Sequence, residues 1–208
     1  MFAPPAGRYL GTATLLLLGL TALWAVDLLP RTWPLLALLL VGLAGLAGLL
    51  VFFRDPERRP GPDIVAPADG RVRAVDRDGP TLRISVFMNV TDVHVNRFPM
   101  DARVTRIETL GSGFRPAYRE EARHNVRRHY HLETELGPVE LVQMTGIVAR
   151  RLVSYVAVGD RRAKGDRLGM IALGSRVDLL LPAARADPCI ALGDRVVAGV
   201  TPVARGRP

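Results

Sequence analysis

Cysteine is almost absent from this 208-residue chain, since Cys189 is the only one. One cysteine forms no disulfide within the chain, which excludes a small secreted module stapled by disulfide bonds. Charged residues make up only 23% of the sequence against 49% hydrophobic residues, a balance that excludes an intrinsically disordered chain. We therefore expect a folded protein in which Cys189 is a small buried side chain.

Lysine is equally scarce, because Lys164 is the only lysine among the 28 basic residues and all the others are arginine. Such a bias is typical of a GC-rich genome rather than of a selected binding chemistry. The net charge of +8 is accompanied by no zinc-finger motif and no RNA-binding motif that combines aromatic and basic residues. We therefore expect no nucleic-acid partner.

Two long stretches carry no charge, Tyr9 to Val26 and Thr32 to Phe53. Each approaches or reaches the roughly 20 residues needed to cross a bilayer, and Pro30 to Pro34 predicts a tight turn between them. Residues 1–53 are therefore predicted to form a transmembrane helical hairpin. A cleaved signal peptide fits less well, because the apolar region is too long and a second span follows it directly. A buried core helix remains the alternative for one of the two spans.

Charge at the ends of the spans predicts the orientation of the hairpin. Arg54, Arg58 and Arg59 follow the second span, whereas the turn offers only Arg31. The positive-inside rule then places both ends of the hairpin, and the domain that follows, on the cytoplasmic face of the cell membrane. Basic residues there would be attracted to anionic headgroups, although most are expected to form ordinary solvated surface.

Residues 54–208 are predicted to form one mainly β domain. Val, Ile and Leu recur at alternate positions or in short runs bounded by Gly, Pro and Asp. The expected strands are Arg71–Val75, Leu82–Met88, Arg128–Glu135, Val139–Met144, Leu152–Val158, Val177–Leu181 and Arg195–Val203, with a brief helix around Ala117–His124. The segment Gly159-Asp160-Arg161 recurs as Gly193-Asp194-Arg195, and each copy is followed by Gly four residues after its Arg, a pattern typical of turns in hammerhead or barrel-sandwich domains.

Two functional alternatives arise from these patterns. Biotinyl and lipoyl carriers modify a lysine at a hairpin tip, and Lys164 lies in one of the repeated turns, although without the neighbours that carriers have. His129 and His131 are two apart on a predicted strand and so share one face, as a pair of zinc ligands in a peptidase would. No third ligand or general base stands at the expected spacing, and an exposed arginine-rich strand explains this segment better.

His94 stands at the end of an apolar strand, where functional sites often form, and Gly174-Ser175 interrupts two apolar strands. Alone, each feature is more often structural, and no Gly-x-Ser-x-Gly elbow surrounds Ser175. Together with other segments, they form a pattern that closely resembles phosphatidylserine decarboxylase proenzymes of the short bacterial and archaeal type. The resemblance rests on Phe52-Phe53-Arg54-Asp55-Pro56, Val65-Ala66-Pro67-Ala68-Asp69-Gly70, His94-Val95-Asn96-Arg97, residues 143–151 (Gln-Met-Thr-Gly-Ile-Val-Ala-Arg-Arg) and Leu173-Gly174-Ser175-Arg176-Val177-Asp178.

The sequence departs from this family at two places. Asn125-Val126-Arg127 has Val where the family usually has Glu. Arg97 occupies the place of a second histidine that longer relatives carry three positions after the first. No role of that second histidine is therefore transferred to this chain.

The resemblance implies a self-processing enzyme. Ser175 attacks the carbonyl of Gly174, the chain breaks between them, and position 175 becomes an N-terminal pyruvoyl group. A β chain of residues 1–174 and an α chain of residues 175–208 result, which form a heterodimer; the resemblance leaves open whether heterodimers assemble further. His94, oriented by Asp69, is the implied base.

The pyruvoyl group is the implied cofactor, without pyridoxal phosphate or metal. It forms a Schiff base with the amine of phosphatidylserine in the membrane, and CO2 and phosphatidylethanolamine result, a step of phospholipid biosynthesis. Arg97, Arg151 and Arg176 are candidates for binding the phosphate or carboxylate of the substrate, because guanidinium groups match such oxyanions. Pairing with an acidic neighbour such as Asp178 is an equally good explanation for any of them. Diacyl and archaeal ether lipids share this headgroup, so the sequence does not distinguish them.

Overall fold

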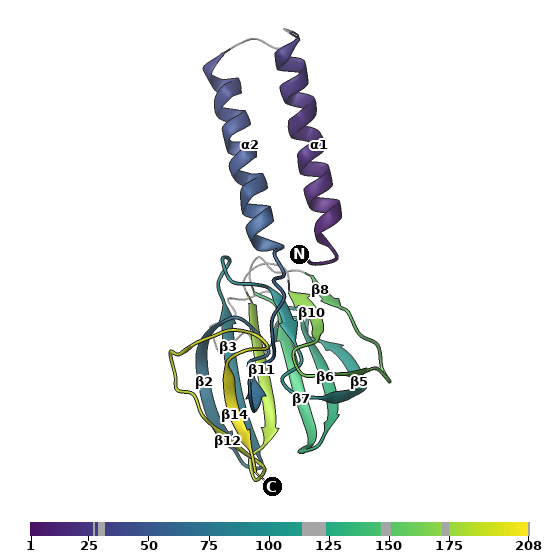
Figure 1. The fold of residues 1–208 in the computed structure, drawn as a ribbon, viewed down its shortest axis with the longest axis vertical. Helices are drawn as coiled ribbons and strands as arrows, with labels where there is room; N and C mark the ends of the chain where they lie inside the picture. Colours follow the sequence, from purple (N-terminus) through teal and green to yellow (C-terminus); the bar gives the residue numbers. More distant parts are fainter. Residues whose placement is uncertain (27, 29–31, 114–123, 147–150, 172–174, 208) are drawn as a thin grey trace. The chain divides into compact units, whose positions relative to one another are not determined.

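The computed structural model describes residues 1–208 except 27, 29–31, 114–123, 147–150, 172–174 and 208. The chain divides into two compact units, Met1–Pro56 and Glu57–Pro208. Figure 1 shows two helices in the first unit and strands in the second.

The first unit is a helical hairpin of α1 (Ala6–Ala25) and α2 (Trp33–Phe52). Pro34 stands in the first turn of α2, where a missing backbone N–H costs nothing. Gly42 of α2 lets the helices approach closely, because a Cβ there would meet the side chain of Leu17. The ends of the hairpin are tied together, since Ala3 N–H donates to Phe53 O at 2.9 Å and Asp55 N–H donates to Met1 O at 2.8 Å.

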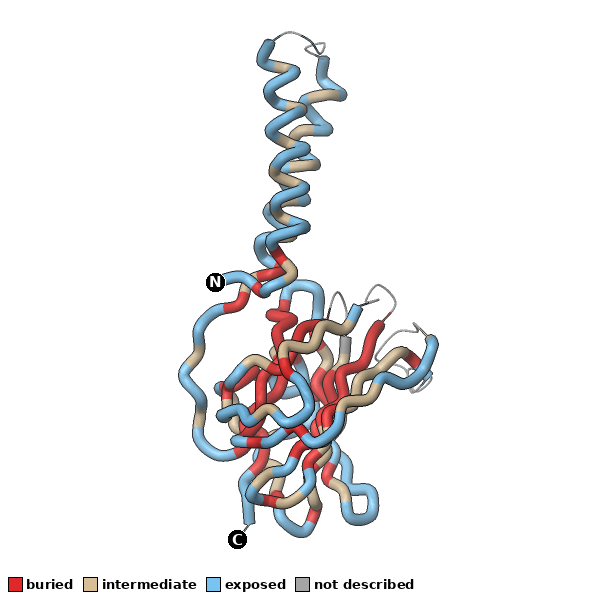
Figure 2. The backbone as a smooth tube through the Cα atoms, turned by 90° about the vertical axis from the view of Figure 1, so that its right-hand side faces the viewer, coloured by how far each residue is buried: buried red, intermediate tan, exposed pale blue. Residues whose placement is uncertain are grey.

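Both helices are long and apolar enough to span a membrane, and only 6% of each apolar window is buried within the structure. Figure 2 shows the helices mostly exposed and the buried segments concentrated in the strands of the second unit. A helix that is apolar on all sides requires an apolar environment, which these two helices do not find within their own unit. A buried core helix, the alternative considered for one span, is therefore wrong.

The described residues of the second unit form three antiparallel sheets. The largest has eight strands in the order β13-β2-β3-β11-β7-β6-β5-β9, and the smaller two have the orders β1-β14-β12 and β4-β10-β8. The bounds are β1 Ile64–Val65, β2 Gly70–Asp78, β3 Thr81–Met88, β4 Val95–Arg97, β5 Ala102–Leu110, β6 Arg127–Thr134, β7 Gly137–Met144, β8 Leu152–Ser154, β9 Arg161–Arg162, β10 Arg167–Ile171, β11 Ser175–Pro182, β12 Ala186–Pro188, β13 Arg195–Val196 and β14 Pro202–Gly206.

One apolar core joins the three sheets. It includes Ile84 and Leu179 of the large sheet, Val203 of the second sheet and Leu168 of the third, all at 0% exposure. Strand β11 lies between β3 and β7, so its apolar residues are at the centre of this core. The position of β11 therefore depends on packing on both sides.

The mainly β fold and the two apolar helices are confirmed. The strands β2, β3, β6, β7 and β11 match predicted ones within a few residues, whereas β4, β5 and β10 were not predicted. The predicted strand over residues 195–203 is instead β13, a turn and the start of β14. Among the described strands, the large sheet runs from one edge at β13 to another at β9 and does not close into a barrel. The predicted brief helix falls almost entirely outside the described residues.

The prediction of a buried Cys189 is wrong, since the structure exposes it. It follows β12 directly and belongs to the loop that leads to β13. Partial burial nevertheless raises the pKa of its thiol, which disfavours a reactive thiolate.

The repeated Gly-Asp segments are turns of one kind. In each, the Asp carboxylate accepts the N–H three residues earlier: Asp160 from Ala157 at 3.2 Å and Asp194 from Ala191 at 2.8 Å. Gly159 and Gly193 have φ of +97° and +92°, a conformation that favours glycine. The repeat therefore encodes turns that end loops and begin strands.

Candidate active site

One end of the large sheet gathers the segments singled out in the sequence. Ser175, the first residue of β11, lies opposite Met88, the last residue of β3. On the other side of β11, Arg176 lies opposite Met144, which in turn lies opposite Arg127. The ends of β3 and β7 and the starts of β6 and β11 therefore lie side by side, with Ser175 beginning β11 and His94 following β3 in the chain.

His94 is connected through its backbone to the segment that precedes the predicted cleavage site. Its carbonyl accepts the N–H of Ile171, the last residue of β10, at 3.3 Å. The next strand residue, Val95, pairs with Met170. Residues 172–174 lie outside the described part of the chain, as does the side chain of Ser175, so the structure describes the strands on both sides of the bond but not the bond itself.

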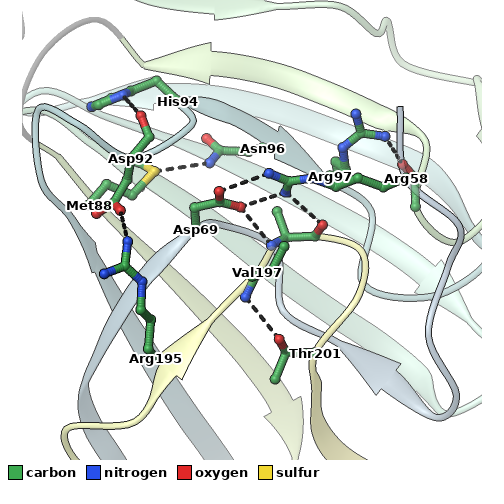
Figure 3. Close-up of polar contacts among 12 residues, drawn as sticks. Arg58, Asp69, Met88, Asp92, His94, Asn96, Arg97, Arg195, Val197 and Thr201 are labelled. Atoms are coloured by element: carbon green, nitrogen blue, oxygen red, sulfur yellow. Dashed lines mark hydrogen bonds and ion pairs between the residues drawn. The ribbon is translucent and has the colours of Figure 1, made fainter. Parts of the chain in front are cut away.

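The ring of His94 is fully buried, and its Nδ1 lies 2.8 Å from the carbonyl oxygen of Asp92. A carbonyl oxygen only accepts hydrogen bonds, so the neutral ring carries its proton on Nδ1 and its lone pair on Nε2. The Asp92 carboxylate is itself held by the Asn89 N–H at 2.8 Å and by Arg195 at 3.1 Å (Figure 3). This local structure leaves Nε2 as the nitrogen that can accept a proton.

The described partners of Asp69 are Arg58 and the backbone of Ala198. Its two carboxylate oxygens form a bidentate ion pair with Arg58 at 2.5 and 2.8 Å, and one also accepts the N–H of Ala198 at 2.8 Å. Arg58 additionally donates to the carbonyl of Ala198 at 2.9 Å (Figure 3). None of the hydrogen bonds that Asp69 makes with described residues goes to His94. The predicted orientation of His94 by Asp69 stays a prediction.

The three candidate substrate arginines differ in their surroundings. Arg97 is 3% exposed and donates to the carbonyl of Gly165 at 2.8 Å. Arg176 forms a bidentate pair with Asp178 at 2.8 and 2.6 Å, the structural alternative considered for it. Arg151 is exposed and directly precedes β8, whose Leu152 pairs with Ile171. Arg151 is thus the candidate best able to meet a ligand.

The segment Asn125-Val126-Arg127 holds the loop after β7. Asn125 is fully buried and its amide donates to the carbonyl of Thr145 at 2.7 Å. Thr145 returns two hydrogen bonds to the carbonyl of Val126, from its N–H at 3.0 Å and its hydroxyl at 2.8 Å. The departure from the family at Val126 therefore lies in a segment whose described contacts are structural.

The histidines of the zinc-peptidase alternative and the lysine of the carrier alternative are bonded to other groups of the chain. His129 pairs with Glu140, and His131 lies 3.4 Å from a carboxylate oxygen of Glu108. Within the described residues, no group of three or more His, Cys, Asp or Glu is placed to hold a metal ion. Lys164 donates through its ammonium group to the carbonyl of Asp63 at 3.2 Å.

Sequence reasoning did not assign the contacts made by Asp92, Arg195 and Arg58. Asp92 lies two residues before His94, but spacing along a loop does not reveal a hydrogen bond. Arg58 and Arg195 are far from their partners in the chain, so no local signal identifies them. A groove of about 650 Å³ lies at the opposite end of the sheet near Thr81 and Pro182, away from His94 and Ser175.

Comparison with known proteins agrees with this geometry. The family model "Phosphatidylserine decarboxylase" matches residues 47–204. A phosphatidylserine decarboxylase proenzyme of Streptomyces avermitilis is 45% identical over 162 residues, 76% of this chain and 74% of the relative. One of Erythrobacter litoralis is 38% identical over 97% of this chain and 86% of its own length. A putative archaetidylserine decarboxylase proenzyme of Halobacterium salinarum is 43% identical over 79% of this chain and 84% of its own length. The chain therefore belongs to the phosphatidylserine decarboxylase family and is a decarboxylase.

Proposed function

We propose that this chain cuts itself between Gly174 and Ser175 and then converts phosphatidylserine to phosphatidylethanolamine and CO2. The observation that carries the proposal is the hydrogen bond between the His94 carbonyl and Ile171 N–H, three residues before Gly174, with Ser175 beginning the next strand. The residue that carries a buried imidazole, with the lone pair on Nε2, is thereby bonded to Ile171, the last described residue before the bond proposed to be cut.

In the first stage Ser175 Oγ attacks the Gly174 carbonyl carbon, and His94 Nε2 takes the hydroxyl proton. The C–N bond between the residues breaks, the nitrogen gains a proton, and an ester links Gly174 to the Ser175 side chain. Loss of the Ser175 α proton then expels the Gly174 carboxylate and leaves dehydroalanine. Water replaces the nitrogen as ammonia departs, giving the pyruvoyl group at position 175.

The environment of position 175 suits such a group. Ser175 opens a strand that is paired with β3 on one side and β7 on the other, so a new N-terminus there would remain attached to the core. The buried residues Val177, Leu179 and Leu181 hold the same strand. We infer that the two pieces, residues 1–174 and 175–208, stay associated after scission as a heterodimer.

The pyruvoyl group supplies a carbonyl that conjugates with the substrate amine and withdraws the electrons left behind by CO2. Proton transfer and binding of the headgroup are assigned to side chains of this protein. His94, after serving as base, is the proposed proton donor to the α carbon. Arg151, exposed beside β8, is the proposed contact for the phosphate or carboxylate of the headgroup, ahead of Arg97 and Arg176, which have internal partners.

The hairpin accounts for access to the substrate. Phosphatidylserine does not leave the bilayer, so an anchor of two spans raises the local concentration of substrate at the enzyme. Because Arg54, Arg58 and Arg59 flank the second span, we propose that the second unit, Glu57–Pro208, is the catalytic unit and lies on the cytoplasmic face of the cell membrane.

Intact-mass analysis of the purified protein tests the proposal. The parent chain should appear as two fragments, the smaller starting at position 175 and carrying a carbonyl that reacts with hydroxylamine. Ser175→Ala should remain one uncut and inactive chain, whereas Ser85→Ala, which removes a buried hydroxyl elsewhere in the sheet, should be cut normally. An active parent protein that is a single chain without a terminal carbonyl would falsify the proposal.

His94→Ala tests the proposed base separately. Removal of a general base typically slows a reaction by about 10²- to 10⁴-fold, and scission should slow by a factor in that range. His131→Ala, which removes a histidine paired with Glu108, should be cut at the parent rate. Equal scission rates in His94→Ala and the parent would exclude His94 as the base.

A further inference from the structure

Three polar side chains form a buried chain that links four strands of the catalytic unit. The Tyr130 hydroxyl of β6 donates to Gln143 Oε1 of β7 at 3.1 Å. Gln143 Nε2 donates to Asn96 Oδ1 of β4 at 2.7 Å. Asn96 Nδ2 then donates to the sulfur of Met88 of β3 at 3.6 Å (Figure 3). All four residues are at 0% exposure.

The direction of each hydrogen bond is determined by the groups that take part. A thioether only accepts, so the amide nitrogen of Asn96 faces Met88 and its oxygen faces Gln143. Gln143 must then present its nitrogen to Asn96 and its oxygen to the Tyr130 hydroxyl. Burial raises the pKa of Tyr130, so its hydroxyl keeps the proton that it donates. Reversal of the Asn96 amide would place donor against donor at Gln143, and reversal of the Gln143 amide would place acceptor against acceptor at Asn96, so only one arrangement satisfies all three hydrogen bonds.

Polar groups in an apolar core cost free energy unless they are paired, and apolar side chains would fill the same space. The fold also makes room for this chain. A Cβ on Gly169 of β10 would lie 3.3 Å from both the Tyr130 hydroxyl and Gln143 Nε2, and would meet the carbonyl of Val153. Filling a hydrophobic core therefore does not explain these residues, whereas a requirement for a defined geometry does.

The last two members of this hydrogen-bonded series, Asn96 and Met88, belong to the two segments that the proposed reaction brings together. Asn96 lies two residues after His94 on the same extended segment. Met88 is the register partner of Ser175. We propose that Tyr130, Gln143 and Asn96 are positioning residues that set the distance between His94 and Ser175. This inference rests on the proposed function and assigns a role to three residues that touch neither the substrate nor the scissile bond.

Gln143→Met breaks both hydrogen bonds of Gln143 while keeping a side chain of similar length. Misplacing a catalytic group by about 1 Å costs on the order of 10²-fold in rate, so scission should slow by roughly 10- to 100-fold. In protein that has matured, kcat should fall while KM stays within about twofold, because the chain does not contact the lipid. Ser85→Ala is the matched control, since Ser85 is also buried in β3 and its hydroxyl has no hydrogen-bond partner among the described residues.

Gln143→Glu separates positioning from simple packing. A protonated Glu side chain still accepts from Tyr130 and donates to Asn96, whereas an ionised one has no proton to donate. Burial favours the protonated form. The ratio of the scission rate of Gln143→Glu to that of the parent should therefore rise towards acid pH, where more of the Glu side chain is protonated. Gln143→Met should show no such rise.

The outcomes are distinguishable. Parent protein that is never cut contradicts the proposed function itself. Parent that is cut, together with a folded Gln143→Met variant cut at the parent rate, overturns the positioning role. A ratio for Gln143→Glu that stays as low as that of Gln143→Met at every pH overturns it if Gln143→Met is slow, because protonation then fails to restore the positioning. Where Gln143→Met does not fold, Tyr130→Phe removes only one hydroxyl, and a scission rate equal to that of Ser85→Ala would count against the inference.

Discussion

At the scale of single residues, Asp69 shows how a side chain acquires a role through distant partners. A family resemblance predicts an acid that orients His94, but the described contacts of Asp69 are with Arg58 and the backbone of Ala198. The Arg58 and Asp69 side chains are 9% and 13% exposed, so the pair is largely removed from water. Arg58 follows the hairpin in sequence, and the pair thus attaches the start of the catalytic unit to the loop after β13.

Removing one partner of this pair leaves a buried charge uncompensated. We expect Asp69→Ala to lower the free energy of unfolding by about 3 kcal/mol, as measured by denaturant titration in the uncut Ser175→Ala background.

If Asp69 acts through Arg58, then Arg58→Ala and Asp69→Ala should slow scission similarly. A variant Arg58→Ala that is cut at the parent rate, beside a slow Asp69→Ala, would support direct orientation of His94 instead.

Arg151 is the residue for which a substrate contact is expected. Charge-assisted hydrogen bonds to phosphate or carboxylate contribute roughly 1.5–3 kcal/mol, so Arg151→Ala should raise KM for phosphatidylserine by about 10- to 100-fold. Scission should be unchanged, because it precedes substrate binding. Arg185→Ala, which removes an exposed arginine in the loop between β11 and β12, serves as control. Unchanged KM in Arg151→Ala would exclude this contact.

At the scale of elements, the hairpin of β6 and β7 presents ionisable side chains beside one another. His129 and Glu140 pair across the two strands, while His131 pairs with Glu108 of β5. The rings of His129 and His131 are stacked with centroids 6.5 Å apart. The histidine pair predicted from alternation along β6 does share one face, and each member is bound to a carboxylate.

The pairing with His129 lowers the pKa of Glu140 in the folded protein. A carboxyl group with a lowered pKa contributes stability above its pKa in the unfolded chain, roughly 4.3, and loses that contribution as pH falls through the folded value. Glu140→Gln should therefore reduce stability near pH 6 by no more than about 1 kcal/mol, because the two side chains are still 17% and 27% exposed and water screens the pair, and the difference from the parent should shrink below about pH 4. Thermal melts of the uncut background at several pH values measure this, and a difference that grows towards acid would contradict the assignment.

At the scale of the whole molecule, the chain divides into two compact units, Met1–Pro56 and Glu57–Pro208, which we propose to be an anchor and a catalytic unit. The unit Glu57–Pro208 contains its own apolar core, drawn from all three sheets. The hairpin contains few buried side chains, and its apolar surface is suited to lipid. We therefore expect the unit Glu57–Pro208 to fold around its own core and to perform the reaction, and the hairpin to give access to a substrate in the bilayer.

Deleting residues 1–56 tests this division. Scission of the remaining unit should proceed at the parent rate, because His94, Ser175 and the proposed positioning residues all lie within it. Turnover of phosphatidylserine in vesicles should fall by about 10²- to 10⁴-fold, since tethering no longer raises the local concentration. Activity on a short-chain substrate dispersed in detergent should be retained. Full activity of the truncated protein on vesicles would show that the hairpin is not the source of access.

The sequence by itself determined the features that depend on local pattern. Runs without charge specify the two apolar helices, alternation specifies strands such as β3 and β7, and the order of short motifs identifies the family. Strands β4 and β5 escaped prediction because short or weakly alternating segments become strands only when neighbours pair with them. Only the tertiary structure decided that Asp69 meets Arg58, that Asp92 holds the tautomer of His94, and that Gln143 joins Asn96 to Tyr130. Such contacts arise from sheet register and the packing of segments far apart in the chain, which no local pattern of residues encodes.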